Sequence, residues 1–353
     1  DQYLSCVDLY GAFLSAFFLS YYWPSQKKYL SEQLQCIQDG YRPYPLYTAI
    51  SMYKNEEDNY EYNWYEFNPV EIRNLDLNYY IPTWSFDCIF ENGSLRESAP
   101  EQTMGYLMGI FGSAYAVNFL DLNRIFYQEV TNIPPWSSPL ERIKYEVCQK
   151  LVILISNIPL IGKKRFCPAQ INNPFYNLQD STISPWLQNR KKITFVDAGI
   201  AYNLPGKPLL CTQRNVDVII FADSSTNIFD RKELHKFFDD AYKTYGYRYT
   251  RIDNQDNMTI GFYQDFVHSQ APAIIYINFI NDKNLLLAAG NDTELADLIC
   301  AHHLETFDAS VCIQKEYCST FNFSYSSFEF MQLSAMAEFN VKINKNAIVQ
   351  FLI

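Results

Sequence analysis

Two aspartates stand at the ends of short apolar runs near the middle of the sequence. Residues 193–196 lead into Asp197, residues 216–222 lead into Asp223, and small residues follow both aspartates. Each run is short enough to form a buried strand. In open α/β sheets, ligands and catalytic groups gather at the carboxyl ends of strands, so both carboxylates are candidate catalytic groups. Either aspartate could equally form a turn by accepting a hydrogen bond from its own backbone.

Three further side chains could take part in acid, base or nucleophile chemistry. Glu66 and Glu71 could form an acid/base pair, but a glutamate in a strand and another after a proline are more often structural contacts. Ser113 stands between a glycine and an alanine. A nucleophile elbow needs Gly-x-Ser-x-Gly between a strand and a helix, whereas Ser113 falls within a predicted helix. The sequence therefore predicts no nucleophile at Ser113.

Nothing in the sequence predicts a metal, a cofactor or a nucleic-acid site. The nine cysteines form no Cys-x-x-Cys pair, and no histidine stands where it would complete a zinc site. His302 and His303 adjoin on a predicted helix and cannot both face one pocket. The net charge of −11 argues against nucleic-acid binding and against attraction to anionic membranes by bulk charge. Any lipid contact should therefore be apolar and local.

The predicted elements form a mixed α/β pattern in a chain with ample material for a core. The sequence has 353 residues, of which 48% are hydrophobic and 17% aromatic. The Pro-, Asn- and Ser-rich stretch 166–190 is predicted as a long loop, either a lid or an irregular connector. Strands are predicted at 44–53, 193–196, 216–222 and 271–279, and helices at 4–22, 27–38, 101–130, 139–156, 231–245, 293–305, 326–339 and 346–353.

The aspartate region resembles a known family. Phe195-Val-Asp-Ala-Gly199, Asn-Leu-Pro at 203–205, Pro208-Leu-Leu, Arg214 and Val216-Asp-Val-Ile-Ile resemble the aspartate segment of the lysophospholipase family. This family comprises the fungal secreted phospholipases B and the related cytosolic phospholipases. Other runs with similar family motifs are Val7-Asp-Leu-Tyr-Gly11, Tyr44-Pro-Leu-Tyr-Thr48, Trp64-Tyr-Glu-Phe-Asn-Pro-Val-Glu71, Met108-Gly-Ile-Phe-Gly-Ser-Ala114, Asn322-Phe-Ser-Tyr325 and Phe339-Asn-Val341.

The resemblance implies a fold and a set of functional residues. It implies a three-layer α/β/α lysophospholipase-like domain, with residues 1–353 as the C-terminal portion of a single catalytic domain. In that family a serine and an aspartate form a catalytic dyad that hydrolyses fatty acyl esters of phospholipids or lysophospholipids, and Asp197 matches the aspartate. Arg214 could orient Asp197 or meet the substrate phosphate, although a structural ion pair is an equal alternative. Gly199 is expected to serve the turn after Asp197.

The family's nucleophile motif, Gly-x-Ser-Gly, does not occur in this sequence. One explanation is a processed enzyme in which a partner chain of the same precursor supplies the serine and completes one sheet. The alternative is a catalytically inactive, phospholipase-like protein with a binding or structural role. An aspartate alone supplies neither a nucleophile nor an oxyanion hole. The sequence therefore carries half of an active site.

The cellular location is predicted from cysteines and glycosylation motifs. Nine cysteines favour an oxidising compartment, because cytosolic chains usually carry fewer. The ending Phe-Ala-Asp-Ser-Ser225 resembles the secreted fungal branch more than the cytosolic one. We therefore expect a secreted or lysosomal/vacuolar glycoprotein, with a cytoplasmic enzyme as the alternative. Asn-x-Ser/Thr motifs that permit glycosylation begin at Asn92, Asn257, Asn291 and Asn322.

Overall fold

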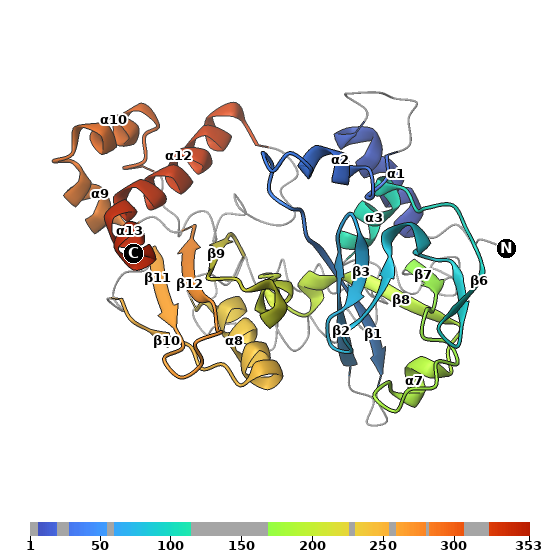
Figure 1. Cartoon of the computed structure of the whole chain (residues 1–353). Helices are drawn as coiled ribbons and strands as arrows, with labels where there is room; N and C mark the ends of the chain where they lie inside the picture. The colour runs from blue at the N-terminus through green and yellow to red at the C-terminus, as the bar shows by residue number, and fades with distance from the viewer. Residues whose placement is uncertain are drawn as a thin grey trace, which may run out of the picture. The chain divides into compact units, whose positions relative to one another are not determined.

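The structure is a computed structural model that describes residues 6–19, 28–54, 60–113, 169–225, 230–253, 259–279, 282–306 and 325–353. Helices and strands mix in these residues (Figure 1), which confirms the predicted α/β class. The chain divides into two compact units, Asp1–Ala201 and Tyr202–Ile353. Among the described residues, no helix is both long enough and apolar enough to cross a bilayer.

The first unit is built on a six-stranded sheet with the strand order β4-β3-β2-β1-β8-β7 (Figure 1). Every neighbouring pair in this sheet is antiparallel. The strand that carries Asp197 is β8, which lies inside the sheet between β1 and β7. The strands are β1 (Tyr47–Lys54), β2 (Tyr60–Phe67), β3 (Glu71–Asn74), β4 (Tyr79–Pro82), β7 (Ala169–Asn172) and β8 (Lys192–Asp197).

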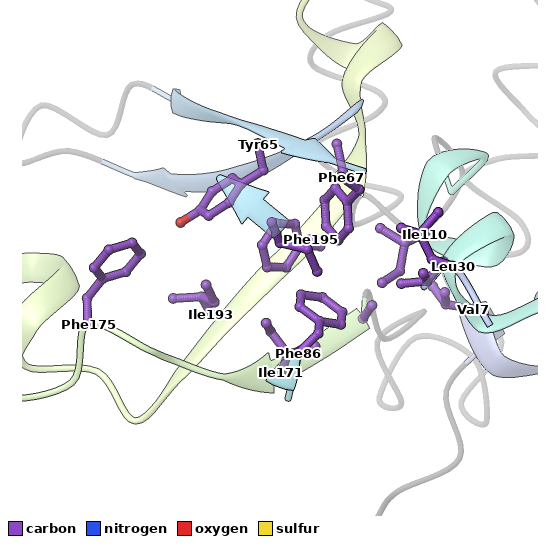
Figure 2. Packing of buried hydrophobic residues seen from close by; sticks show 14 of the residues in the cluster. Val7, Leu30, Tyr65, Phe67, Phe86, Ile110, Ile171, Phe175, Ile193 and Phe195 are labelled. Atoms are coloured by element: carbon purple, nitrogen blue, oxygen red, sulfur yellow. The ribbon is translucent and has the colours of Figure 1, made fainter. Parts of the chain in front are cut away.

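An aromatic cluster holds β8 from one face of this sheet (Figure 2). The ring centroid of Phe195 lies 4.7 Å from that of Tyr65, 5.8 Å from that of Phe67 and 5.7 Å from that of Phe86. All three pairs meet edge to face, a geometry that contributes about 0.5–1.5 kcal/mol per pair beyond the buried area. Ring packing therefore adds to the backbone hydrogen bonds that fix β8.

The helices of the first unit are shorter than predicted. The third helix stops at Gly112, whose backbone N–H donates to the Met108 carbonyl oxygen at 3.1 Å. Residues 114–130 and the predicted helix 139–156 lie outside the described residues. The structure has α1 (Cys6–Phe18), α2 (Gln33–Ile37) and α3 (Met104–Phe111) where helices are predicted over 4–22, 27–38 and 101–130.

Helices α1 and α3 pack backbone against backbone at small residues. A Cβ atom on Gly11 would lie 2.4 Å from the Gly105 carbonyl oxygen, and one on Gly109 would lie 2.5 Å from the Val7 carbonyl oxygen. Only glycine leaves room for such a close approach. The glycines in the two helical motifs are therefore explained by helix packing, without any role in chemistry.

The composition of residues 166–190 predicts one long loop, but the described part of this stretch, from residue 169, contains regular elements. It contains the edge strand β7 and the short helix α7 (Pro185–Gln188). Asn173 fixes the chain between them, because its side-chain amide donates to the carbonyl oxygens of Leu187 and Arg190 at 2.6 and 2.7 Å. The prediction failed because the asparagines and prolines lie at the ends of short elements here. A hairpin of β5 (Ile89–Glu91) and β6 (Ser94–Glu97) completes the described part of this unit.

The second unit contains a four-stranded sheet with the order β10-β11-β12-β9 (Figure 1). Strands β9 and β12 are parallel, and the other two pairings are antiparallel. Asp223 and Asn278 lie opposite each other at the carboxyl end of the parallel pair. The strands are β9 (Val218–Asp223), β10 (Thr250–Arg251), β11 (Ile260–Gln264) and β12 (Ala273–Asn278), of which β10 and β11 were not predicted.

Four helices described in the second unit match predicted helices, whereas the helix Lys283–Ala289 was not predicted. Side-chain caps mark three helix starts, with Asp282, Asp292 and Ser326 accepting hydrogen bonds from backbone N–H groups. Ser326 and Glu329 form a reciprocal capping box. The helices are α8 (Lys232–Tyr245), α9 (Lys283–Ala289), α10 (Thr293–Ala301), α12 (Ser327–Ile343) and α13 (Lys345–Leu352).

The expectation that one sheet contains both aspartate-bearing runs is wrong. Residues 193–196 belong to β8 in the six-stranded sheet, and residues 218–222 belong to β9 in the four-stranded sheet. A short apolar run predicts burial, but it does not specify which strand will pair with it. Asp197 consequently ends an antiparallel strand, whereas Asp223 ends a parallel one.

Replacing Gly109 by alanine should destabilise the first unit by about 1–3 kcal/mol, because the added Cβ meets the Val7 backbone, which cannot move independently of α1. This cost should outweigh the gain in helix propensity, about 1 kcal/mol. Urea unfolding followed by circular dichroism measures the change. Gly290→Ala is the matched control, since its Cβ would approach its nearest neighbour only to 3.4 Å. Equal stability of the two variants would contradict the packing.

Candidate functional site

Asp197 is the last residue of β8 and lies opposite Ala49 on β1. Ala49 is fully buried, and the neighbouring pair of Ile50 and Val196 is buried as well. Because side chains alternate along a strand, Asp197 follows Phe195 on the same face. The sheet therefore fixes the backbone of Asp197, and its carboxylate lies at the end of the strand.

The Asp197 carboxylate is partly buried and weakly compensated. Its Oδ1 atom accepts a hydrogen bond of 2.8 Å from the backbone N–H of Gly199. Burial raises the pKa of Asp197 above the ordinary value of 3.8, while the Gly199 N–H opposes that shift. Within the described residues, no cation contributes to this pKa. A carboxylate whose ionised form is poorly stabilised is a stronger base, so Asp197 is suited to accept a proton.

Gly199 lies in the turn after Asp197, where the sequence places it. The chain leaves β8 through the 3₁₀ turn η3 (Ala198–Ile200), and Asp197 caps the start of this turn. Small residues let the chain turn without covering the carboxylate. Gly199 thus forms part of the turn, and its backbone N–H donates a hydrogen bond to the Asp197 carboxylate.

Asp223 shows how a structural aspartate at a strand end differs from Asp197. Its Oδ2 atom accepts a hydrogen bond of 2.7 Å from the Tyr276 hydroxyl, and its Oδ1 atom accepts one of 2.8 Å from the Ser225 N–H. Burial and the adjacent Asp223 carboxylate raise the pKa of Tyr276. Asp223 therefore stabilises the end of the parallel strand pair, which agrees with the turn-forming alternative.

Arg214 ends the 3₁₀ turn η5 (Thr212–Arg214). It belongs to the second unit, whereas Asp197 belongs to the first. Its predicted role beside Asp197 or a substrate phosphate therefore stays a prediction. The neighbouring Lys207 is buried and pairs with Asp240 at 3.1 Å, so this segment already contains one structural ion pair.

Glu66 and Glu71 serve the turn between β2 and β3. Glu66 is buried and accepts a hydrogen bond of 2.8 Å from the Asn68 side-chain amide. The Asn68 Oδ1 atom accepts hydrogen bonds from the N–H groups of Val70 and Glu71, both at 2.9 Å. These contacts support the structural alternative over an acid/base pair.

Ser113 follows α3 directly and is fully buried. Its hydroxyl donates to the Ile110 carbonyl oxygen at 2.7 Å, as expected for a serine that closes a helix. The sequence predicts that Ser113 forms no nucleophile elbow, and this buried position beside a helix end agrees with that prediction. Ser113 was predicted to lie inside the helix, whereas it lies just after the helix end.

The histidines and cysteines of the described residues form no metal site. His302 follows α10 as its C-cap, and the Nδ1 atom of His303 lies 3.6 Å from Glu305 at the surface. Free thiols are found at Cys36, Cys88, Cys211 and Cys300. These four cysteines give no support to the expectation of an oxidising compartment.

One surface feature was not recognised in the sequence. The turn after β11 exposes Phe266 and Val267 beside His268. The available signal was Asp265-Phe-Val-His268, in which an aspartate can bond the N–H groups that follow it. Two adjacent apolar residues at the tip of such a turn predict exposure better than burial.

Comparison with known proteins identifies the family. The family model described as lysophospholipase catalytic domain matches residues 1–258. The mouse protein named cytosolic phospholipase A2 zeta is 23% identical over 392 aligned positions, which cover 98% of this chain and 45% of that protein.

Two solved structures share the fold. The human GIVD cytosolic phospholipase A2 has a TM-score of 0.68 at 18% identity, covering 100% of this chain and 49% of that one. The same human enzyme in complex with methyl gamma-linolenyl fluorophosphonate has a TM-score of 0.60 at 18% identity, covering 100% and 44%.

The chain thus spans less than half the length of these relatives. The family model nevertheless matches well over half of the chain, and its match includes β8, Asp197 and the turn at Gly199. This chain belongs to the lysophospholipase catalytic domain family.

Proposed function

We propose that this chain supplies the aspartate of a Ser-Asp dyad that hydrolyses fatty acyl esters of phospholipids or lysophospholipids. The observation that carries the proposal is the position of Asp197, in the family's aspartate motif and at the end of a strand held within a sheet. Its raised pKa supports a role as base. The chain would then be the C-terminal portion of a single catalytic domain.

The chemistry assigned to Asp197 is proton transfer. The serine Oγ–H gives its proton to the Asp197 carboxylate as Oγ attacks the acyl carbonyl carbon, and the carbonyl oxygen becomes the oxyanion. When the tetrahedral intermediate collapses, the C–O bond to the glycerol oxygen breaks and the proton on Asp197 passes to that leaving oxygen. Water then attacks the acyl-serine as Asp197 accepts one of its protons. When this second tetrahedral intermediate collapses, the bond between the acyl carbon and the serine Oγ breaks, the proton on Asp197 returns to Oγ, and the fatty acid is released.

The serine must come from residues outside this sequence, because no Gly-x-Ser-Gly occurs within residues 1–353. We propose that the missing motif is on a polypeptide that completes the catalytic domain, either a separate chain of the same precursor or the remainder of a longer chain. Arg214 is proposed to contact the substrate phosphate or to orient Asp197. A cation suits either role, since both partners are anionic.

We place the protein in the cytoplasm. Relatives are named cytosolic phospholipases A2, which supports the cytoplasmic alternative over a secreted or lysosomal/vacuolar location. The four free thiols agree with a reducing compartment. The proposals of a secreted, glycosylated chain have no such support.

Changing Asp197 to asparagine should lower kcat by about 10²–10⁴-fold, because the amide cannot accept the serine proton. Hydrolysis of a lysophospholipid by the complete enzyme, with the serine-bearing part present, measures this loss. Ser113→Ala is the control and should keep wild-type turnover, since its hydroxyl only closes α3. Wild-type turnover by Asp197→Asn would show that the dyad assignment is wrong.

Thermal unfolding of the same variant separates chemistry from folding. A raised folded-state pKa means that ionised Asp197 opposes folding at neutral pH. Asp197→Asn should therefore be as stable as the wild type, or more stable, at pH 7. The stability difference should shrink as the pH falls through the raised pKa of folded Asp197, and it should vanish at a pH below the ordinary value of 3.8.

A serine-reactive fluorophosphonate probe followed by denaturing electrophoresis and intact mass locates the nucleophile. We expect the probe to label a serine in the native, complete enzyme. A separate, smaller labelled chain supports the two-chain enzyme, and a single labelled chain that also contains Asp197 supports a longer one. If no chain takes up the label, the protein is a non-catalytic member with a binding or structural role.

A further inference from the structure

A rigid turn in the second unit presents two apolar side chains to solvent. The carboxylate of Asp265 accepts hydrogen bonds from the Arg248 N–H at 2.6 Å, the Val267 N–H at 2.7 Å and the His268 N–H at 3.0 Å. The ring Nδ1 atom of His268 lies 2.8 Å from the same carboxylate. Burial opposes the charge of Asp265, but these hydrogen bonds outweigh it and lower its pKa to about 2. The turn is thus fixed by an ionised side chain beneath it.

The two residues at the tip are among the most exposed apolar side chains described. Phe266 is 70% exposed and Val267 is 77% exposed. Single exposed apolar residues are ordinary, but two neighbours on a preorganised turn form a small apolar projection. Transferring both side chains out of water would be favourable, and the fixed turn means that little backbone entropy is lost when they are transferred.

Cationic and aromatic side chains surround this projection. An open hollow of about 640 Å³ beside it is lined by Tyr242, Lys243, Gly246, Arg248, Val267 and His268. The Arg248 guanidinium lies 5.3 Å from the centre of the Tyr242 ring, so the two side chains are held together by a cation–π contact. Tyr242 is itself half exposed. Together, Tyr242, Lys243, Arg248, Phe266, Val267 and His268 form what we call the 242–268 surface.

We propose that the 242–268 surface docks on an anionic phospholipid membrane, with Phe266 and Val267 entering the acyl boundary and Lys243 and Arg248 facing lipid phosphates. Apolar side chains with neighbouring cations and a tyrosine are the combination that suits the interface of a bilayer. The net charge of −11 means that bulk charge does not draw this chain to an anionic bilayer, so Lys243 and Arg248 are assigned a local attraction to lipid phosphates. The inference takes its lipid partner from the proposed function, but it does not depend on Asp197.

Vesicle co-sedimentation of the complete enzyme tests the proposal without turnover. The wild type should bind phosphatidylcholine vesicles that contain phosphatidylserine more strongly than pure phosphatidylcholine vesicles. The double variant Phe266→Ser/Val267→Ser should lose about tenfold or more of its partitioning on both. The double variant Lys243→Gln/Arg248→Gln should lose about fivefold per charge on the anionic vesicles and little on the neutral ones.

Leu287→Ser is the matched control, because Leu287 is 78% exposed in the same unit but has no place in the 242–268 surface. It should bind as the wild type does, and circular dichroism should show that all variants are folded. Wild-type vesicle binding by Phe266→Ser/Val267→Ser overturns the proposal. So does a dimer in solution that this double variant dissociates, since a second copy would then cover the surface. Loss of binding with unchanged labelling of the serine separates this inference from the dyad proposal.

Discussion

The proposed basicity of Asp197 depends on one constraint, the partial burial of the carboxyl end of β8. Hydrogen bonds to β1 and β7 fix the strand from both edges, and the edge-to-face rings around Phe195 fix it from one face. The carboxylate of Asp197 is therefore partly withdrawn from water, at the end of a strand that the sheet and the aromatic rings hold in place. A mobile loop would let the charge return to solvent, and its basicity would fall to that of an ordinary aspartate.

The rest of the first unit supports that strand end. The backbones of helices α1 and α3 approach each other closely at glycines, so the two helices pack without side chains between them at these positions. Val7 and Ile110 from these helices belong to the same buried cluster as Phe195 (Figure 2). Leu107 of α3 belongs to this cluster as well. The helical motifs thus pack around Phe195, which precedes Asp197 by two residues on β8. Asp223 instead accepts a hydrogen bond from the Tyr276 hydroxyl, so two aspartates in similar local sequences differ in their hydrogen-bond partners.

The sequence predicts much of this structure, and its failures have physical reasons. Short apolar runs locate β8, β9 and β12, and the helical pattern locates α10 and α12, because both signals are local. Strand pairing is not local, so the separation of β8 and β9 into two sheets was missed. Asp197 was proposed as the base from its motif, whereas its pKa depends on burial that sequence cannot specify. The exposure of Phe266 and Val267 was missed for a related reason, since exposure follows from the turn that Asp265 stabilises.

The pH dependence of serine phosphonylation tests the central claim most directly. The rate of fluorophosphonate labelling would be measured against pH for the complete enzyme and for Asp197→Asn. The account predicts that the wild-type rate falls as the pH is lowered through a pKa above 3.8, the ordinary value, and that Asp197→Asn is labelled far more slowly at every pH. Labelling of Asp197→Asn at the wild-type rate would contradict the assignment of Asp197 as the base.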